Sequence, residues 1–420
     1  MSSSKTKKKN WASSLGPGLI TGASDDDPSG IATYSQAGAQ FGFTTLWTML
    51  FTYPLMATVQ EISARIGRVT GQGISANILR YYGRPLSYII VFLLLIANTL
   101  NLGADIGAMG EGMKLLLGGS AFLYAFLLAS LSVLLQIFVR YTRYVFYLKW
   151  LTMSLFAYVA TVFIVKIPWT EVLHYTFLPH ISFNKDFLIV LIALFGTTIS
   201  PYLFFWQASE EAEDEADTPG KLPLSQAPEQ ATPELQRITF DTYIGMAYSN
   251  IVSFCIILAT AATLHTHGMH NIETAAQAAE ALRPLAGKFA FLLFTLGIIG
   301  TGLLALPVLA GSSAYAVGET FGWPIGLEKN LKNAKGFYTV LLLGFIVGLF
   351  LIRSSINPMK VLFWAAVING VIAVPVMIMM ILIGSNPKAM GKFTIPLHLK
   401  FLAWITVLMM FGTVAGLLVV

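Results

Sequence analysis

The feature that most constrains the fold is a series of apolar segments that fills most of the chain. Of its 420 residues, 55% are hydrophobic and only 11% are charged, so most of the surface must face lipid. A helix needs about 20 apolar residues to cross a bilayer. Windows near this length lie at 14–42, 43–64, 86–109, 121–139, 145–166, 187–209, 239–264, 289–318, 336–352, 358–383 and 399–419. The sequence therefore predicts an all-α, polytopic membrane protein with about eleven transmembrane helices.

The distribution of basic residues predicts the orientation. If the basic N-terminus, 1–13, is cytoplasmic, nineteen Lys and Arg residues fall on the cytoplasmic side and seven on the other side. Short cytoplasmic loops of membrane proteins carry an excess of Lys and Arg. We therefore expect a multi-pass protein of the cell membrane with its N-terminus inside. The net charge of +5 then reflects orientation in the lipid bilayer and needs no nucleic-acid partner, and the oligomeric state is left open.

Two of the apolar segments are interrupted by proline at corresponding places in the two halves. Three aspartates, Asp25 to Asp27, precede Pro28 in the first segment, and Pro201 lies in the sixth. Proline removes a backbone donor and disfavours helical geometry at the preceding residue, although each proline by itself could merely kink a packed helix. Paired interruptions indicate an inverted-repeat transporter. We expect broken helices 1 and 6 in a 5+5 repeat, with repeats over 14–166 and 187–383 and an appended helix over 399–420.

The acidic break predicts a cation site. Three adjacent carboxylates away from water cannot all stay ionised without a counter-charge, because desolvation and mutual repulsion disfavour the charged form. A divalent cation would relieve both effects. We expect Asp27 to be the first ligand and Asp26 the second, while Asp25 could instead cap a helix or face water. Oxygen atoms would complete the set, from Ser24, Thr197 and Ser200. Oxygen ligands suit Mg²⁺, Ca²⁺ and Mn²⁺, whereas sulfur favours softer metals.

Three other polar features carry weaker signals. Asp105 is a charge within the third apolar segment, where it could relay a proton, order the metal site or be paired structurally. Asn369 precedes a glycine in the tenth segment and could support the site or bond between helices. The segment 210–236 begins with a run of acidic residues and continues rich in Pro, Ala and Gln. It indicates a mobile cytoplasmic loop, either a cation-attracting vestibule or a solvated connector.

The sequence around these features resembles the Nramp family of divalent-metal transporters. The segment GPGLI at 16–20, the pair Asp27-Pro28 followed by two small residues, and SARIGRVTG at 63–71 are similar to that family, and the resemblance covers nearly the whole membrane region. It implies a LeuT-like fold, alternating access, and a metal ion held between broken helices 1 and 6. Carried over by position, the family's metal-binding aspartate falls at Asp27 and its carbonyl-donating alanine at Ser24. In helix 6 the family's alanine falls at Thr197.

The chain departs from the family pattern at several of these positions. Gly30 stands where the family has a ligand asparagine, Ser200 where it has a methionine, and Tyr202 where it has a histidine linked to proton movement. Asp105 matches an acid of the third helix, but Ala108 replaces the glutamate that follows, and 336–352 holds no arginine. The pattern looks more like the Nramp-related magnesium-transporter branch, in which the sulfur ligand is also missing. Gly30 and Ser200 would leave room for the waters that Mg²⁺ retains.

These observations predict a transporter, and not an enzyme, that imports Mg²⁺ or Mn²⁺ by alternating access and needs no cofactor besides the transported ion. One alternative is a proton-coupled Mn²⁺/Fe²⁺ symporter of the Nramp type. Another is a LeuT-like permease for amino acids or other organic solutes, which the three aspartates disfavour because they repel a carboxylate. A membrane enzyme or signalling protein that uses 210–217 as a partner site lacks any catalytic motif in the sequence.

Overall fold

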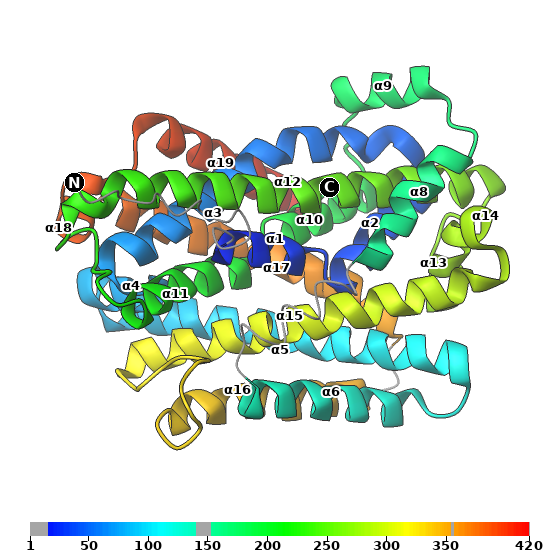
Figure 1. Cartoon of the computed structure of the whole chain (residues 1–420). Helices are drawn as coiled ribbons and strands as arrows, with labels where there is room; N and C mark the ends of the chain where they lie inside the picture. Colours follow the sequence, from blue (N-terminus) through cyan, green and yellow to red (C-terminus); the bar gives the residue numbers. More distant parts are fainter. Residues whose placement is uncertain (1–15, 140–152, 354–356, 420) are drawn as a thin grey trace, which may run out of the picture.

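The computed structural model describes residues 16–139, 153–353 and 357–419, and over these ranges it contains helices and no strand. The basic N-terminus, 1–13, and the beginning of the fifth expected span lie outside them. Long helices run between two ends of the molecule (Figure 1). One end carries α4 (Ile74–Tyr82) and α18 (Pro387–Met390), and the other carries α13 (Ala275–Ala279) and α14 (Arg283–Ala286). We call them the α4–α18 end and the α13–α14 end.

The first half of the chain supplies the helices of five expected spans. In order they are α1 (Pro17–Asp25), α2 (Pro28–Phe41), α3 (Leu46–Thr70), α5 (Arg84–Leu117), α6 (Ala121–Phe138) and α8 (Phe156–Ile164). Two short 3₁₀ turns, η2 (Gly42–Thr45) and η3 (Met153–Leu155), precede α3 and α8. The short helix α9 (Trp169–Phe177) connects the two halves.

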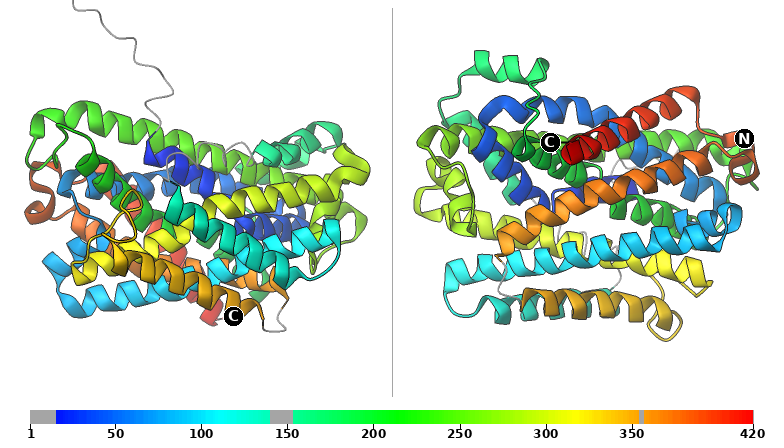
Figure 2. Two further views of the ribbon diagram at one scale, coloured as in Figure 1. Left: turned by 60° about the horizontal axis from the view of Figure 1, so that its bottom comes forward. Right: turned by 180° about the vertical axis from the view of Figure 1, so that it is seen from behind.

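The second half supplies the helices of the remaining six expected spans. They are α10 (Lys185–Thr198), α11 (Pro201–Asp217), α12 (Ala231–Thr263), α15 (Ala290–Phe321), α16 (Lys335–Ile352), α17 (Pro358–Gly384) and α19 (Leu397–Val419). Short 3₁₀ turns lie in the connections, η4 (Pro228–Gln230), η5 (His265–His267), η6 (Glu280–Leu282), η7 (Gly287–Phe289) and η8 (Gly391–Phe393). The view from behind shows α19 on the surface of the bundle (Figure 2).

Length and hydrophobicity confirm most of the expected spans. Within the described residues, eight helical segments are long and apolar enough to cross a membrane, and α10 with α11 counts as one of them. Three expected spans fall outside this group. They are the first, which carries three aspartates at its break, the second, whose helix α3 carries charged residues in its second half, and the fifth, of which only the last part is described. The spans differ in burial, since the most apolar window of α10–α11 is 94% buried and those of α6 and α19 are 22% buried. The broken sixth helix therefore lies at the centre.

Both expected breaks are present. Helix α1 ends at Asp25, Asp27 is extended with ψ 171°, and α2 begins at Pro28. Helix α10 ends at Thr198, Ser200 is extended with ψ 131°, and α11 begins at Pro201. Pro54, Pro307 and Pro375 instead lie inside continuous helices. Proline alone therefore does not interrupt a helix in this chain, and the breaks also need extended residues before it.

Glycines allow the broken helices to lie against their neighbours. A Cβ at Gly18 would come within 2.8 Å of the Thr242 backbone nitrogen on α12, and a Cβ at Gly196 would come within 2.8 Å of Gly370 Cα on α17. Small residues at helix contacts allow such close backbone approach in membrane proteins. The first half of each broken helix is thereby packed directly on a long helix of the second repeat.

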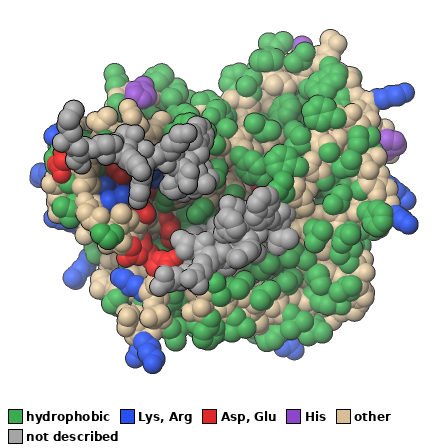
Figure 3. Space-filling view, viewed as in Figure 1, with side chains coloured by type: hydrophobic (Ala, Val, Ile, Leu, Met, Phe, Trp, Pro, Cys, Tyr) green, Lys and Arg blue, Asp and Glu red, His purple; other side chains and the backbone are tan. Residues whose placement is uncertain are grey.

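The expectation that 210–236 is a mobile loop is wrong for its acidic part. Residues 210–217 are the last turns of α11, and residues 231–236 begin α12, so only 218–230 connects the two helices. Glu211 and Glu215 are buried, because arginines from α3 and α12 lie against them. The space-filling view shows hydrophobic side chains over much of the visible surface and a group of acidic side chains toward the α4–α18 end (Figure 3).

Candidate metal-binding site at the two helix breaks

The two breaks meet in the centre of the bundle, and Tyr202 joins them. Its hydroxyl donates to the carbonyl oxygen of Ser24 at 3.2 Å and to Asp27 Oδ2 at 3.3 Å. Tyr202 follows Pro201, so the start of α11 lies directly over the end of α1. Helix C-termini carry partial negative charge, and the ends of α1 and α10 both lie at these breaks. The Ser24 carbonyl at the end of α1 can therefore face a cation, while Asp27 caps the start of α2, where the partial charge is positive.

Asp27 lies at the centre of this contact, with 2% of its surface exposed. It caps α2, since its Oδ1 accepts the Gly30 backbone N–H at 2.7 Å. Its Oδ2 accepts a hydrogen bond from Asn101 Nδ2 at 2.9 Å in addition to that from Tyr202. All of these donors are neutral. These contacts therefore orient the Asp27 carboxylate without pairing it with a positive charge. A carboxylate in this state can bind a cation.

Helix α5 contributes two side chains to the site. Asn101 and Asp105 are four residues apart and so share one helix face. Sequence reasoning named Asp105 but missed Asn101, which this i, i+4 spacing could have revealed. Asp105 is fully buried and lies close enough to Asp27 for the two carboxyl groups to interact electrostatically. It lies near the backbone of Ser29, but neither of its oxygens has a partner of hydrogen-bond geometry within the described chain.

The three expected oxygen donors occupy different positions. Thr197 Oγ1 lies 3.1 Å from where a Cβ would sit on Gly30, so it faces the start of α2 directly. The Ser24 hydroxyl donates back to Ile20 O at 2.9 Å, and only its carbonyl reaches the site. The Ser200 hydroxyl donates to Gly196 O at 2.7 Å and Thr197 O at 3.0 Å, within its own segment. The Ser24 carbonyl therefore shares a hydrogen-bond donor with Asp27 and Thr197 lies beside Gly30, whereas the Ser200 hydroxyl is engaged within its own segment.

The other two aspartates of the triplet face α12. Ser249 Oγ donates to Asp25 Oδ2 at 2.5 Å and to Asp26 Oδ1 at 3.2 Å, and Ser253 Oγ donates to Asp26 Oδ1 at 3.1 Å. Asp25 is fully buried, so it faces neither water nor the Asp27 contacts. The break thus sends Asp27 toward α5 and α11 and its two neighbours toward α12.

Asn369 lies on α17 beside the close approach of Gly370 to α10. It is buried, and its Oδ1 has no hydrogen-bond partner among the residues that the structure describes. The α17 backbone also reaches α2, since Leu362 O accepts a hydrogen bond from Ser29 Oγ at 3.0 Å. Asn369 therefore belongs to the helix that supports both breaks, and its expected supporting role stays a prediction.

The donor set around Asp27 consists of oxygen and amide groups. Across residues 16–139, 153–353 and 357–419, no three His, Cys, Asp or Glu side chains come together as a metal cluster. A cation at Asp27 would therefore use one carboxylate with hydroxyl, carbonyl and amide oxygens and water. This arrangement is typical of Mg²⁺, which takes one or two carboxylates and keeps several waters.

A cavity of about 500 Å³ extends from the α13–α14 end toward this site. Its walls come from α2, α5, α15 and α17, and its lining includes Ala32, Ala108 and Leu362. Leu362 accepts the hydrogen bond from Ser29, two residues after Asp27. Two carboxylates, Glu111 and Glu273, also line the cavity and give it acidic character.

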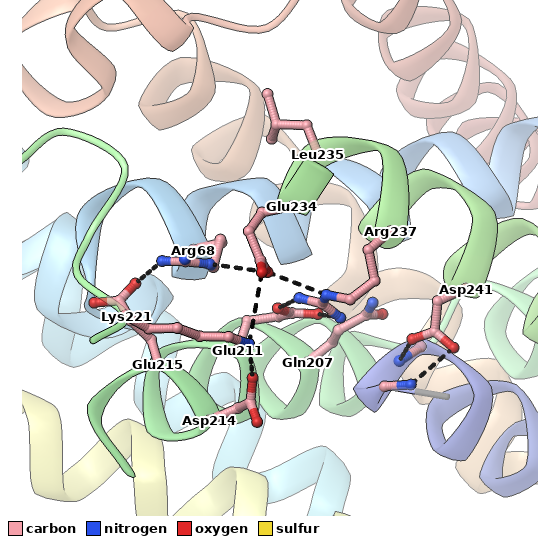
Figure 4. A network of polar contacts seen from close by, with 12 residues as sticks. Arg68, Gln207, Glu211, Asp214, Glu215, Lys221, Glu234, Leu235, Arg237 and Asp241 are labelled. Carbon is pink, nitrogen blue, oxygen red and sulfur yellow. Dashed lines mark hydrogen bonds and ion pairs between the residues drawn. The ribbon is translucent and has the colours of Figure 1, made fainter. Parts of the chain in front are cut away.

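A network of buried and half-buried charges occupies the α4–α18 end (Figure 4). Arg68 of α3 pairs with Glu215 at 2.6 Å and with Glu234 at 3.3 Å. Arg237 of α12 pairs with the same Glu234 at 3.2 Å and with Glu211 at 2.5 Å. The network joins α3, α11 and α12 across the end of the bundle that lies opposite the cavity.

Asp241 connects α1 to this end of the bundle. Its carboxylate accepts the backbone N–H groups of Gly16 at 3.2 Å, Gly18 at 2.7 Å and Leu19 at 3.2 Å. Figure 4 shows the Asp241 side chain directed at this end of α1. The first N–H groups of a helix have no partner within the helix, so they bind an anion well. Asp241 on α12 therefore fixes the position of the α1 N-terminus.

A buried polar site between two broken helices, within a bundle of apolar helices, defines a multi-pass membrane transporter of the LeuT-like fold. Solved structures show the same fold. A manganese transporter of Eremococcus coleocola superimposes with a TM-score of 0.73 over 97% of this chain and 87% of that chain, at 15% identity. Mhp1, a nucleobase-cation-symport-1 family transporter, superimposes with a TM-score of 0.53 over 96% and 91%, at 16% identity.

Sequence comparison identifies the family. The model of natural resistance-associated macrophage protein-like (Nramp) proteins matches residues 18–420, and the chain belongs to this family. A divalent metal cation transporter MntH from Pectobacterium carotovorum is 26% identical over 381 residues, which cover 87% of this chain and 84% of that protein. An MntH from Klebsiella pneumoniae is 24% identical over 414 residues, covering 96% and 93%. The family expected from the sequence is confirmed.

Proposed function

We propose that this protein imports a hard divalent cation, Mg²⁺ or Mn²⁺, through the site at the two breaks. The observation that carries the proposal is Asp27, a buried carboxylate held by neutral donors between the two broken helices. Relatives named as divalent metal cation transporters and a solved manganese transporter support the substrate class. The transported ion supplies the positive charge that Asp27 lacks among its contacts.

Asp27 binds the ion, and the Ser24 carbonyl and Thr197 hydroxyl are the next ligands. Tyr202 and Asn101 orient Asp27, and Asp105 is a second buried carboxyl group nearby. Ser200 contributes through its backbone, since its hydroxyl is engaged within its own segment. Asp26 is directed to α12 and does not share the ion with Asp27 in this arrangement. The set holds no sulfur, which favours Mg²⁺ and Mn²⁺ over softer metals.

The protein moves the ion by alternating access. The cavity at the α13–α14 end reaches the residues next to the site, while the charge network and Asp241 hold the α4–α18 end together. If the α4–α18 end is cytoplasmic, as the basic residues predict, this arrangement faces outward. Release into the cell then requires α1 to move away from α12.

Uptake into proteoliposomes tests the proposal. We expect Asp27→Ala and the nearly isosteric Asp27→Asn to reduce uptake of both Mg²⁺ and Mn²⁺ by at least about tenfold, because a charged ligand contact contributes about 1.5–3 kcal/mol. The matched control is Asp186→Asn, which removes an exposed carboxylate from the first turn of α10. Normal uptake by the Asp27 variants in correctly inserted protein would overturn the assignment.

Internal pH, followed in the same experiment, separates this proposal from a proton-coupled Mn²⁺/Fe²⁺ symporter. We expect cation entry without acidification, because Tyr202 stands where the family has the histidine linked to proton movement. Its hydroxyl is engaged with Ser24 and Asp27. Mn²⁺ entry with acidification, and no Mg²⁺ entry, would establish the symporter instead.

A further inference from the structure

A second polar pocket lies on the other side of the α1–α2 break from Asp27. Asp25 and Asp26 both face α12, where Ser249 and Ser253 donate to one oxygen of each carboxylate. Their remaining oxygens, Asp25 Oδ1 and Asp26 Oδ2, are buried and have no hydrogen-bond partner in the described part of the chain. Two buried carboxylates thus retain free lone pairs.

A tyrosine completes the pocket. Tyr34 of α2 is fully buried, and its hydroxyl lies near both carboxylates and beside Ser253 and Thr197. It makes no hydrogen bond of normal geometry to any of them. Buried hydroxyl groups normally have a partner, so an unpartnered one beside two carboxylates indicates a missing ligand. That ligand must be compatible with oxygen donors only.

The local backbone also favours a cation. Asp25 is the last residue of α1, and Asp26 is its C-cap. A helix C-terminus carries partial negative charge, and the C-terminal ends of half-helices in such transporters coordinate monovalent cations. The hydrogen bonds that the two carboxylates accept come from the neutral serines Ser249 and Ser253. These contacts therefore supply no positive charge to the two carboxyl groups.

We propose that Asp25, Asp26, Ser249 and Ser253, with Tyr34, form a second cation site, which takes a dehydrated monovalent ion such as Na⁺. The residues are enclosed, with 0% exposure for all five, so the ion must shed its water. Mg²⁺ gives up water reluctantly and would not suit this pocket. The ion bridges α1 to α12, and its binding therefore favours the position of α1 seen in this structure.

Thermal unfolding of the full-length protein in detergent, at fixed pH and ionic strength, tests this site. Na⁺ is titrated against N-methylglucamine, and no divalent ion is present. We expect a saturable rise in the unfolding temperature for the wild type, because a ligand that binds only the folded state stabilises it. Asp26→Asn and Ser253→Ala should raise the half-saturating Na⁺ concentration by roughly tenfold or more.

Two controls make the result specific. Thr260→Val removes another α12 hydroxyl, which donates only to Ile256 O and Ile257 O, and it should keep the wild-type Na⁺ response. Asp27→Ala should also keep the Na⁺ response but lose divalent-cation binding. The experiment therefore tests the second site independently of the Asp27 site. The absence of a Na⁺ response in the wild type, or an unchanged response in both Asp26→Asn and Ser253→Ala, would refute the second site.

Discussion

The contact between Asp241 and the N-terminus of α1 gives the sharpest test of how the α4–α18 end is held closed. Asp241→Asn keeps the size of the side chain and one acceptor oxygen but removes the negative charge. In the structure the Asp241 carboxylate accepts hydrogen bonds from three backbone N–H groups, at 2.7 to 3.2 Å. We therefore expect the substitution to release α1 from α12 without unfolding the bundle.

The magnitude follows from the number and kind of these bonds. Hydrogen bonds to charged groups contribute about 1.5–3 kcal/mol each, against about 0.5–1.5 kcal/mol for neutral ones. The asparagine oxygen can still accept a hydrogen bond, but the asparagine NH₂ group cannot accept one. The position of α1 against α12 should therefore lose about 2–4 kcal/mol of stabilisation. Each 1.4 kcal/mol changes a two-state ratio about tenfold. The fraction of molecules with α1 released should rise about 30-fold or more.

Hydrogen exchange measured by mass spectrometry reads this change directly. Peptides covering 17–25 should exchange about 30-fold faster in Asp241→Asn, while peptides from the centre of α15 should not change. Asp186→Asn is again the matched control, because it is an exposed carboxylate in the first turn of another helix. Unchanged exchange in α1, with Asp241→Asn folded and inserted, would refute the argument that this carboxylate holds α1.

Two other substitutions test the charge network and the width of the metal site. Arg68→Met should destabilise the protein by about 3–5 kcal/mol, because it leaves Glu215 buried and unpaired, and adding Glu215→Gln should recover part of the lost unfolding temperature. A stability equal to wild type in the single variant contradicts this role. Gly30→Asn places its Cβ about 3.1 Å from Thr197 Oγ1 and should lower Mg²⁺ uptake about tenfold more than Mn²⁺ uptake, because it fills space beside the ion. An unchanged ratio of the two uptake rates excludes a hydrated ion at this position.

The sequence by itself predicted most of the spans, both breaks and Asp27 as the candidate metal ligand. Apolar windows of bilayer length predict helices because the lipid cannot satisfy backbone hydrogen bonds. The sequence also predicts the breaks at Pro28 and Pro201, because small or polar residues accompany each proline. Asp27 followed from its position next to the first break. All of these signals are local in the chain, and the resemblance to a known family agreed with them.

The tertiary structure alone decided which side chains meet. The three aspartates are adjacent in sequence, but the break turns Asp27 toward Asn101 on α5 and the other two toward Ser249 on α12, 224 residues away from Asp25. The acidic run 210–217 looked like a solvated loop because its partner Arg68 lies 147 residues before Glu215. A charge pattern reports the polarity of a segment, but whether that segment is solvated or buried depends on the helix that packs against it.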